Sequence, residues 1–140
     1  MDGVELIKKY EGFRAKAYKC PVGVWTIGYG STTWADGKPV KSKDTITQEQ
    51  AEGLLINWLN INVRPKLAGL NLKPGQQAAI ESLVYNVGTG FFRSQCFVGI
   101  KEKDWGKVMK NWDWIKAGGK VLPGLVKRRT EEMYLFFQDL

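Results

Sequence analysis

The chain has 140 residues, of which 44% are hydrophobic and 25% are charged, and this balance is typical of one globular domain. Its formal net charge of +7 favours polyanionic partners, but the basic residues are scattered, and no recognisable module or single-sign stripe indicates nucleic-acid binding. The absence of histidine excludes serine–histidine and cysteine–histidine catalysis and most zinc sites, so acid–base chemistry must use Glu, Asp, Cys, Lys or Tyr.

Residues 3–10 are expected to form the first element, a short amphipathic helix. Val4, Ile7 and Tyr10 recur there at helical spacing, and lysines occupy the opposite side. Gly12 follows as the type of glycine that commonly ends a helix, so Glu11 is expected at the very end of this one.

Residues 17–45 are expected to form a small antiparallel sheet. The β-prone segments 17–19 and 25–27 are separated by turn residues at 20–23, and Gly28 and Gly30 are spaced as in a tightly twisted hairpin. The sequence Asp-Gly-Lys-Pro at residues 36–39 indicates a further turn.

The remainder of the chain is expected to be helical. Thr47 begins a helix through a capping box with Gln50, and this helix runs to about Val63, where Pro65 interrupts or ends it. Further helices are expected over residues 74–87, 94–100, 104–115 and 125–137, with a break at residues 118–119.

These elements predict a single α+β domain that is mostly helical. A β-rich lobe would cover about residues 12–46, and a long connecting helix would cover about residues 47–63. The helical lobe would take about residues 64–140 together with the N-terminal helix. A cleft between two such lobes is the default place for a substrate.

Glu11 is the best candidate for the acid of a glycoside hydrolase, an enzyme that usually places two groups on opposite sides of the scissile bond. It lies among Tyr10, Phe13 and Tyr18, and partial burial there would keep a carboxylic acid protonated near neutrality. A single glutamate at a helix end is more often a solvated surface residue, so this position alone does not define a site.

Three blocks of sequence, in order along the chain, carry a resemblance to one family. Glu11, position 20 and Thr26 are spaced like the catalytic triad of the phage-type lysozymes, glycoside hydrolase family 24, and the segments at residues 10–13 and 25–30 are also similar. The segments Leu-Val-Tyr-Asn-Val-Gly at 83–88 and Pro-Gly-Leu-Val-Lys-Arg-Arg-Thr-Glu-Glu at 123–132 resemble two further blocks of that family. The resemblance implies a lysozyme-like fold that hydrolyses the β-1,4 bond from N-acetylmuramic acid to N-acetylglucosamine, with no cofactor or metal.

Carried over by position, the resemblance implies that Glu11 is the general acid and that the Thr26 hydroxyl helps to hold the attacking water. The commoner residue of the family at position 20 is Asp, and this chain has Cys20, whose ordinary pKa of about 8.5 leaves it neutral. A thiolate would activate water or attack carbon, and Lys16 and Lys19 are candidates for stabilising it. Whether Cys20 is base, nucleophile or dispensable stays open, and with it the inverting or retaining outcome.

Other residues have weaker claims to the site. Candidates for substrate binding in and after the hairpin are Tyr18, Gly30, Thr32 and Trp34, with a backbone role as the alternative for the glycine. A C-terminal arginine approaches the acid in the family, so Arg128 or Arg129 would orient it; the alternative is a surface ion-pair network with Glu131 and Glu132. Trp58, Trp105, Trp112 and Trp114 are interpreted as core residues, and Cys96 as a buried, inert thiol.

The resemblance therefore implies a muramidase that acts on bacterial peptidoglycan during host lysis, and we expect it to act as a monomer without nucleic acid or stable membrane association. The N-terminus lacks the features of a secretory signal, and no stretch of eighteen apolar residues exists. We therefore expect the protein to stay in the host cytoplasm until it is released to the wall. Two alternatives remain, a lytic transglycosylase that needs only one carboxylic acid and a non-catalytic peptidoglycan-binding module.

Overall fold

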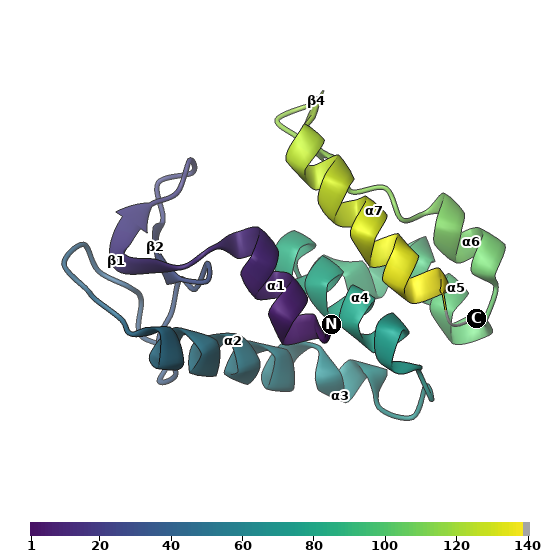
Figure 1. Ribbon diagram of the computed structural model, residues 1–140, viewed down its shortest axis with the longest axis horizontal. Coiled ribbons are helices and arrows are strands. Elements are labelled where there is room, and N and C mark those ends of the chain that lie inside the picture. The colour runs from purple at the N-terminus through teal and green to yellow at the C-terminus, as the bar shows by residue number, and fades with distance from the viewer. Residues whose placement is uncertain (139–140) are drawn as a thin grey trace.

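The computed structural model describes residues 1–138, so the last two residues of the predicted helical lobe lie outside the described part. Its helices are α1 (Gly3–Glu11), α2 (Gln48–Asn62), α3 (Arg64–Leu67), α4 (Pro74–Val87), α5 (Gln95–Glu102), α6 (Trp105–Lys110) and α7 (Pro123–Phe137), with a short 3-10 helix at Thr89–Arg93 (Figure 1). Its strands are β1 (Arg14–Lys19), β2 (Trp25–Gly28), β3 (Lys116–Ala117) and β4 (Lys120–Val121). The predicted class, α+β and mostly helical with a small antiparallel β lobe, is confirmed.

The β lobe is built on one antiparallel hairpin, β1–β2, in which Tyr18 is the partner of Thr26. The turn between the strands is closed by the backbone amide of Cys20, which donates to the carbonyl of Val24 at 3.0 Å. The predicted sheet is less regular beyond this hairpin, because the following segment is joined by isolated bridges, at residues 16 and 45, 27 and 31, and 33 and 39.

Local sequence signals set the ends of the first two long helices. Asp2 caps α1 by accepting a hydrogen bond from a backbone amide, and Gly12 ends it with φ of 70°, a conformation that disfavours side chains. Glu11 is consequently the last residue of α1, as predicted. The capping box of Thr47 and Gln50 at the start of α2 is also confirmed.

One prediction for the second half of the chain is wrong, and a second, the break at residues 118–119, is correct but less specific than the structure. The helix expected over residues 104–115 ends at Lys110, because the side-chain amide of Asn111 donates to the carbonyl of Lys107 and the chain turns inward to bury Trp112. The glycines interpreted as a break form the two-residue turn of the β3–β4 hairpin, with φ of 58° at Gly118 and 79° at Gly119.

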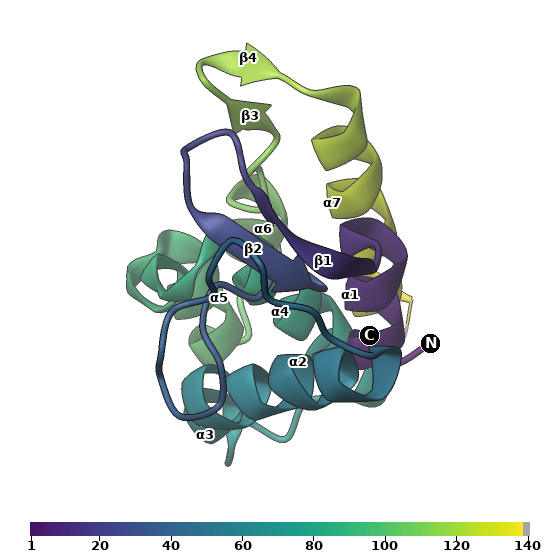
Figure 2. The ribbon, with the colours of Figure 1, turned by 90° about the vertical axis from the view of Figure 1, so that its left-hand side faces the viewer.

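The core lies mainly in the helical lobe, where α4 is the central helix. It packs against both α1 and α7, and most of its side chains are buried. In Figure 2 helix α2 runs below it. Helix α2 runs from the β lobe towards the helical lobe and buries Leu55 and Leu59. None of the helices within residues 1–138 has the length and apolar character that crossing a membrane requires.

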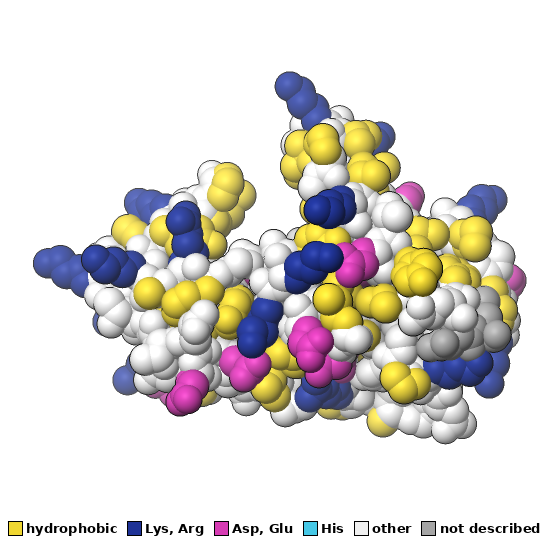
Figure 3. Space-filling view, in the orientation of Figure 1, with side chains coloured by type: hydrophobic (Ala, Val, Ile, Leu, Met, Phe, Trp, Pro, Cys, Tyr) yellow, Lys and Arg dark blue, Asp and Glu magenta, His cyan; other side chains and the backbone are white. Residues whose placement is uncertain are grey.

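Two projections rise from the same side of the molecule, and we call them the hairpin arm and the α7 arm. The hairpin arm is β1–β2, residues 14–28, and the α7 arm is residues 114–127, which include β3–β4 and the start of α7 (Figure 1). The space-filling view in Figure 3 shows an open hollow between them. Each arm therefore forms one wall of a cleft.

Candidate active site

Glu11 lies at the foot of the hairpin arm with its two carboxylate oxygens in different surroundings. Its Oε2 accepts a hydrogen bond from Nη1 of Arg128 at 2.7 Å. Its Oε1 lies beside Gly30, so close that a methyl group added to this glycine would come within 3.1 Å of it. The Glu11 side chain keeps 21% of its exposure, so a substrate in the cleft can reach it.

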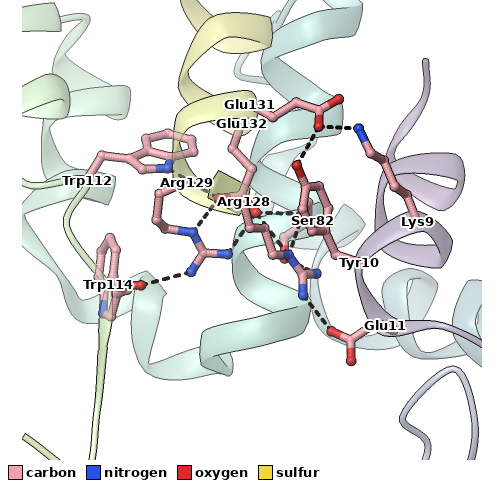
Figure 4. A network of polar contacts seen from close by, with 10 residues as sticks. All are labelled: Lys9, Tyr10, Glu11, Ser82, Trp112, Trp114, Arg128, Arg129, Glu131 and Glu132. Carbon is pink, nitrogen blue, oxygen red and sulfur yellow. Dashed lines mark hydrogen bonds and ion pairs between the residues drawn. The ribbon is translucent and has the colours of Figure 1, made fainter. Parts of the chain in front are cut away.

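Arg128 is buried behind Glu11 and is fixed by several polar contacts (Figure 4). Its Nε donates to the Ser82 hydroxyl and its Nη2 to the Ser82 carbonyl, both at 3.2 Å. Its Nε is also 3.4 Å from a carboxylate oxygen of Glu132, and that oxygen accepts from the Ser82 hydroxyl at 2.5 Å. The guanidinium therefore orients Glu11 from a support that cannot swing away without breaking a buried network.

The adjacent Arg129 does not share this role, because its Nη2 donates to Glu132 at 2.9 Å on the side of α7 that faces away from Glu11. Burial raises the pKa of Glu132 and lowers the pKa of Arg129. The predicted surface network is thus wrong for Glu132, which is fully buried. It is wrong for Glu131 as well, because the partners of that carboxylate are Lys9, at 2.6 Å, and Tyr10 rather than an arginine.

Cys20 and Thr26 lie on the hairpin arm, Cys20 directly after β1 and Thr26 within β2. Backbone N–H groups of Val24 and then Val22 lower the pKa of the Cys20 thiol. In the structure the Thr26 hydroxyl donates its single proton to the Val24 carbonyl at 3.0 Å, which leaves the oxygen as an acceptor.

The groups that lower the pKa of Cys20 most are backbone donors of the turn, so stabilisation of the thiolate by Lys16 and Lys19 stays a prediction. The ammonium of Lys19 lies over the ring of Trp25, 5.4 Å from its centroid. The other cysteine, Cys96, is buried as predicted, and burial raises its pKa to about 12. The turn therefore favours an anion at position 20, whether that anion is a thiolate or a carboxylate.

A groove of about 340 Å³ begins beside Glu11 and runs between the segment after β2 and helix α2. This volume falls within the range of about 300–1,000 Å³ that is usual for small-molecule sites. Three of the predicted substrate-binding residues, Gly30, Thr32 and Trp34, line it. Tyr18 does not, and its ring lies under the guanidinium of Arg14 at 4.5 Å.

Sequence reasoning missed the wall of the groove that α2 and α4 supply. Asn57, Trp58 and Asn62 of α2 line it, as does Tyr85 of α4. Trp58, predicted as a core residue, packs against the core and also lines the groove. A signal was present, because asparagines interrupt the apolar side of α2. Within residues 1–138 no cluster of three or more His, Cys, Asp or Glu residues is arranged to hold a metal ion.

A glutamate that is held by a buried arginine and lies next to a groove of this size fits the acid of a glycoside hydrolase. Residues 8–132 match the family described as phage lysozyme, and the chain belongs to that family. The predicted lysozyme class is therefore confirmed.

Relatives by sequence are endolysins of phages. The endolysin of Acyrthosiphon pisum secondary endosymbiont phage 1 is 41% identical over 147 residues, which cover 96% of this chain and 94% of the relative. The endolysin of Bacillus phage B103 is 37% identical over 143 residues, and here the chain spans only 52% of the relative.

Solved structures give the same fold. A variant of P22 lysozyme is 32% identical with a TM-score of 0.76, and the match covers 99% of both chains. The muramidase domain of SpmX from Asticaccaulis excentricus is 31% identical with a TM-score of 0.77, covering 97% of this chain and 95% of that one.

Proposed function

We propose that this lysozyme hydrolyses the β-1,4 bond between N-acetylmuramic acid and N-acetylglucosamine in peptidoglycan, and that Glu11 is its general acid. The observation that carries the proposal is the position of the Glu11 carboxyl group, with Oε2 bound to buried Arg128 and Oε1 at the head of the groove. A muramidase domain and a P22 lysozyme variant with the same fold support the choice of bond.

The acid step requires a protonated carboxyl group beside the leaving oxygen. Sugar that fills the groove next to Gly30 displaces water from around the carboxyl group of Glu11. Arg128 restricts the carboxyl group to one orientation, so that its free oxygen faces the bound sugar. Glu11 then transfers its proton to the oxygen of N-acetylglucosamine as the glycosidic bond breaks.

We assign the opposite side of the bond to Cys20 and Thr26. Water attacks the anomeric carbon of N-acetylmuramic acid, gives its proton to the Cys20 thiolate, and is held by the Thr26 oxygen. The backbone donors that lower the pKa of Cys20 support this role, because only the thiolate is a base. Attack by water from the face opposite the leaving group gives inversion at that carbon.

The positive charge of the hairpin arm and the α7 arm is complementary to the polyanionic bacterial cell wall. Residues 12–35 and 114–130 contain basic residues but no aspartate or glutamate, so both walls of the cleft are positive (Figure 3). The exposed cations are Arg14, Lys16 and Lys19 on the hairpin arm and Lys116, Lys120 and Lys127 on the α7 arm.

We also propose that the enzyme acts as a monomer in host lysis and passes from the host cytoplasm to the wall when the membrane is breached. A site assembled entirely from one chain supports the monomer, and the endolysin names of the relatives support the role in lysis.

One experiment tests the site and the reaction together. The lysis of peptidoglycan suspensions is followed for the wild type and for Glu11→Gln, and the muropeptide products are weighed by mass spectrometry. We expect reducing muramic ends from the wild type and a loss of about a thousandfold in the variant. Anhydro-muramic ends would show the lytic transglycosylase instead, and binding without soluble fragments would show a non-catalytic module. Full activity of Glu11→Gln would remove Glu11 from the mechanism.

A further inference from the structure

Tyr85 lies on α4 where the helical lobe meets the β lobe. Its hydroxyl donates to the backbone carbonyl of Tyr29 at 2.8 Å. The edge of its ring packs against Trp58, with 5.2 Å between the ring centroids. Burial raises the pKa of Tyr85 to about 12, so the phenol remains a proton donor throughout the neutral range. This bond ties the segment that follows β2 to the central helix.

That segment is the part of the β lobe that contacts the acid. Gly30 follows Tyr29, and an added methyl group at Gly30 would lie 3.1 Å from Oε1 of Glu11 and 4.0 Å from a ring carbon of Tyr85. Gly30 also has φ of 93°, a conformation that side chains rarely adopt. The free oxygen of Glu11 is thus confined by a backbone segment that the Tyr85 hydroxyl joins to α4, while two backbone bonds between Ile27 and Ser31 close the turn of the segment.

The other oxygen of Glu11 is located from the same helix. Ser82, three residues before Tyr85 on α4, contacts Arg128 through both its hydroxyl and its carbonyl at 3.2 Å. Arg128 in turn binds Oε2 of Glu11 at 2.7 Å. Residues three apart on a helix lie on the same side, so one turn of α4 supports both oxygens.

We propose that Tyr85 is a positioning residue for the hydrolysis, and that its bond to the Tyr29 carbonyl holds Gly30 against Glu11 and so directs the proton of the acid towards the glycosidic oxygen. This inference rests on the proposed role of Glu11. It assigns Tyr85 an effect on the chemical step rather than on sugar binding, although its ring also lines the groove.

The test is Tyr85→Phe, which removes the hydroxyl and keeps the ring that packs against Trp58. The matched control is Tyr10→Phe, which removes a hydroxyl that donates to Glu131 at 2.5 Å on the outer side of α1 and α7 (Figure 4). Initial rates are measured on soluble peptidoglycan fragments of defined length, with the melting temperature of each variant. We expect Tyr85→Phe to lower kcat about tenfold with KM unchanged, and Tyr10→Phe to keep both constants.

Three outcomes would overturn the inference. A raised KM with unchanged kcat would mean that the hydroxyl binds sugar, and wild-type constants would mean that it does nothing for the reaction. If Tyr10→Phe lowered kcat as much as Tyr85→Phe does, the loss of activity would not be specific to the bond between Tyr85 and the Tyr29 carbonyl. Failure of the proposed function is distinguishable, because it would appear as full activity of Glu11→Gln whatever the result for Tyr85.

Discussion

Glu11 and Cys20, the two residues that we propose act on the glycosidic bond, are supported in very different ways. Glu11 is backed by Arg128, which is buried with Ser82 and Glu132 between two packed helices. Cys20 lies at an irregular turn of an exposed two-stranded hairpin, and the groups that stabilise its anion belong to the backbone. The proposed acid, Glu11, therefore depends on side chains far away in the sequence, whereas the proposed base, Cys20, depends on the local shape of one turn.

The largest effect is expected from breaking the support of the acid. Arg128→Met removes one cation from buried Glu132 and also the partner of Glu11, while the control Arg129→Met removes a cation from Glu132 without touching Glu11. We expect each change to lower the free energy of unfolding by about 3–5 kcal/mol, measured by urea denaturation. Activity per folded molecule should fall about a hundredfold in Arg128→Met alone.

Arg128→Lys is a second variant for the case that Arg128→Met does not fold. It keeps the positive charge but loses the planar guanidinium that binds Glu11. An Arg129→Met enzyme that loses as much activity per folded molecule as Arg128→Met would show that the network acts only through stability. The orientation of Glu11 by Arg128 would then have no place in the mechanism.

The proposed role of Cys20 as the base is tested by two substitutions at position 20. Cys20→Ser should reduce lysis about ten- to a hundredfold, because a hydroxyl is not ionised at neutral pH, and Cys20→Asp should retain most activity. The pH dependence of activity tests whether position 20 must be ionised. Wild-type activity should fall as the pH drops through the pKa of Cys20, and Cys20→Asp should move that acidic limb to lower pH, since an aspartate ionises near pH 4. Lysis by Cys20→Ser at the wild-type rate would remove the thiol from the mechanism.

The two cysteines give a direct measure of how the turn acts on its sulfur. The rate of iodoacetamide alkylation is followed against pH in the native protein and in urea, with peptide mapping to separate Cys20 from Cys96. Because the pKa of Cys20 is lowered in the folded protein, its alkylation rate should reach a plateau at lower pH in the native protein than in urea. Cys96, fully buried with a pKa raised to about 12, should stay unmodified until the chain unfolds. Identical profiles for Cys20 in both states would contradict stabilisation by the turn.

The smallest effect is expected from the charge of the exposed arm. Lys16→Glu with Lys19→Glu should slow lysis of peptidoglycan about three- to tenfold at low salt and less at high salt, because exposed charges are screened. The control carries the same change in net charge at Lys101 and Lys110, on the opposite end of the molecule. Equal slowing by both pairs would mean that only net charge matters.

This contrast also explains what the sequence could and could not predict. The position of Glu11 was predictable because Gly12 ends α1 through a local signal, and the capping box at Thr47 was predictable for the same reason. The choice between Arg128 and Arg129 was not, because neighbours on a helix point about 100° apart and only the packing of α7 decides which meets α1.

Features that depend on backbone geometry were also hidden. The donors to Cys20 are backbone N–H groups, which nearly every residue carries, so the sequence does not mark them. The neighbouring lysines were predicted because their charge is visible in the sequence. The early end of α6 was missed because it depends on Trp112 reaching the buried Glu132 of α7, with 3.4 Å between the indole nitrogen and the carboxylate. The family resemblance supplied the pairing of Glu11 with position 20 and Thr26, which spacing alone would not have defined.

The bond between Glu11 and Arg128 joins residues that are 117 positions apart, and this separation has a consequence for synthesis. At about 5–20 residues per second, a ribosome needs roughly 6–25 s after making Glu11 before it adds Arg128. Throughout that time, and for longer while the last helix remains in the exit tunnel, the nascent chain has an acid without its support. A truncated product that stops before α7 would likewise lack an oriented acid, so incomplete chains should be harmless to the wall of the cell that makes them.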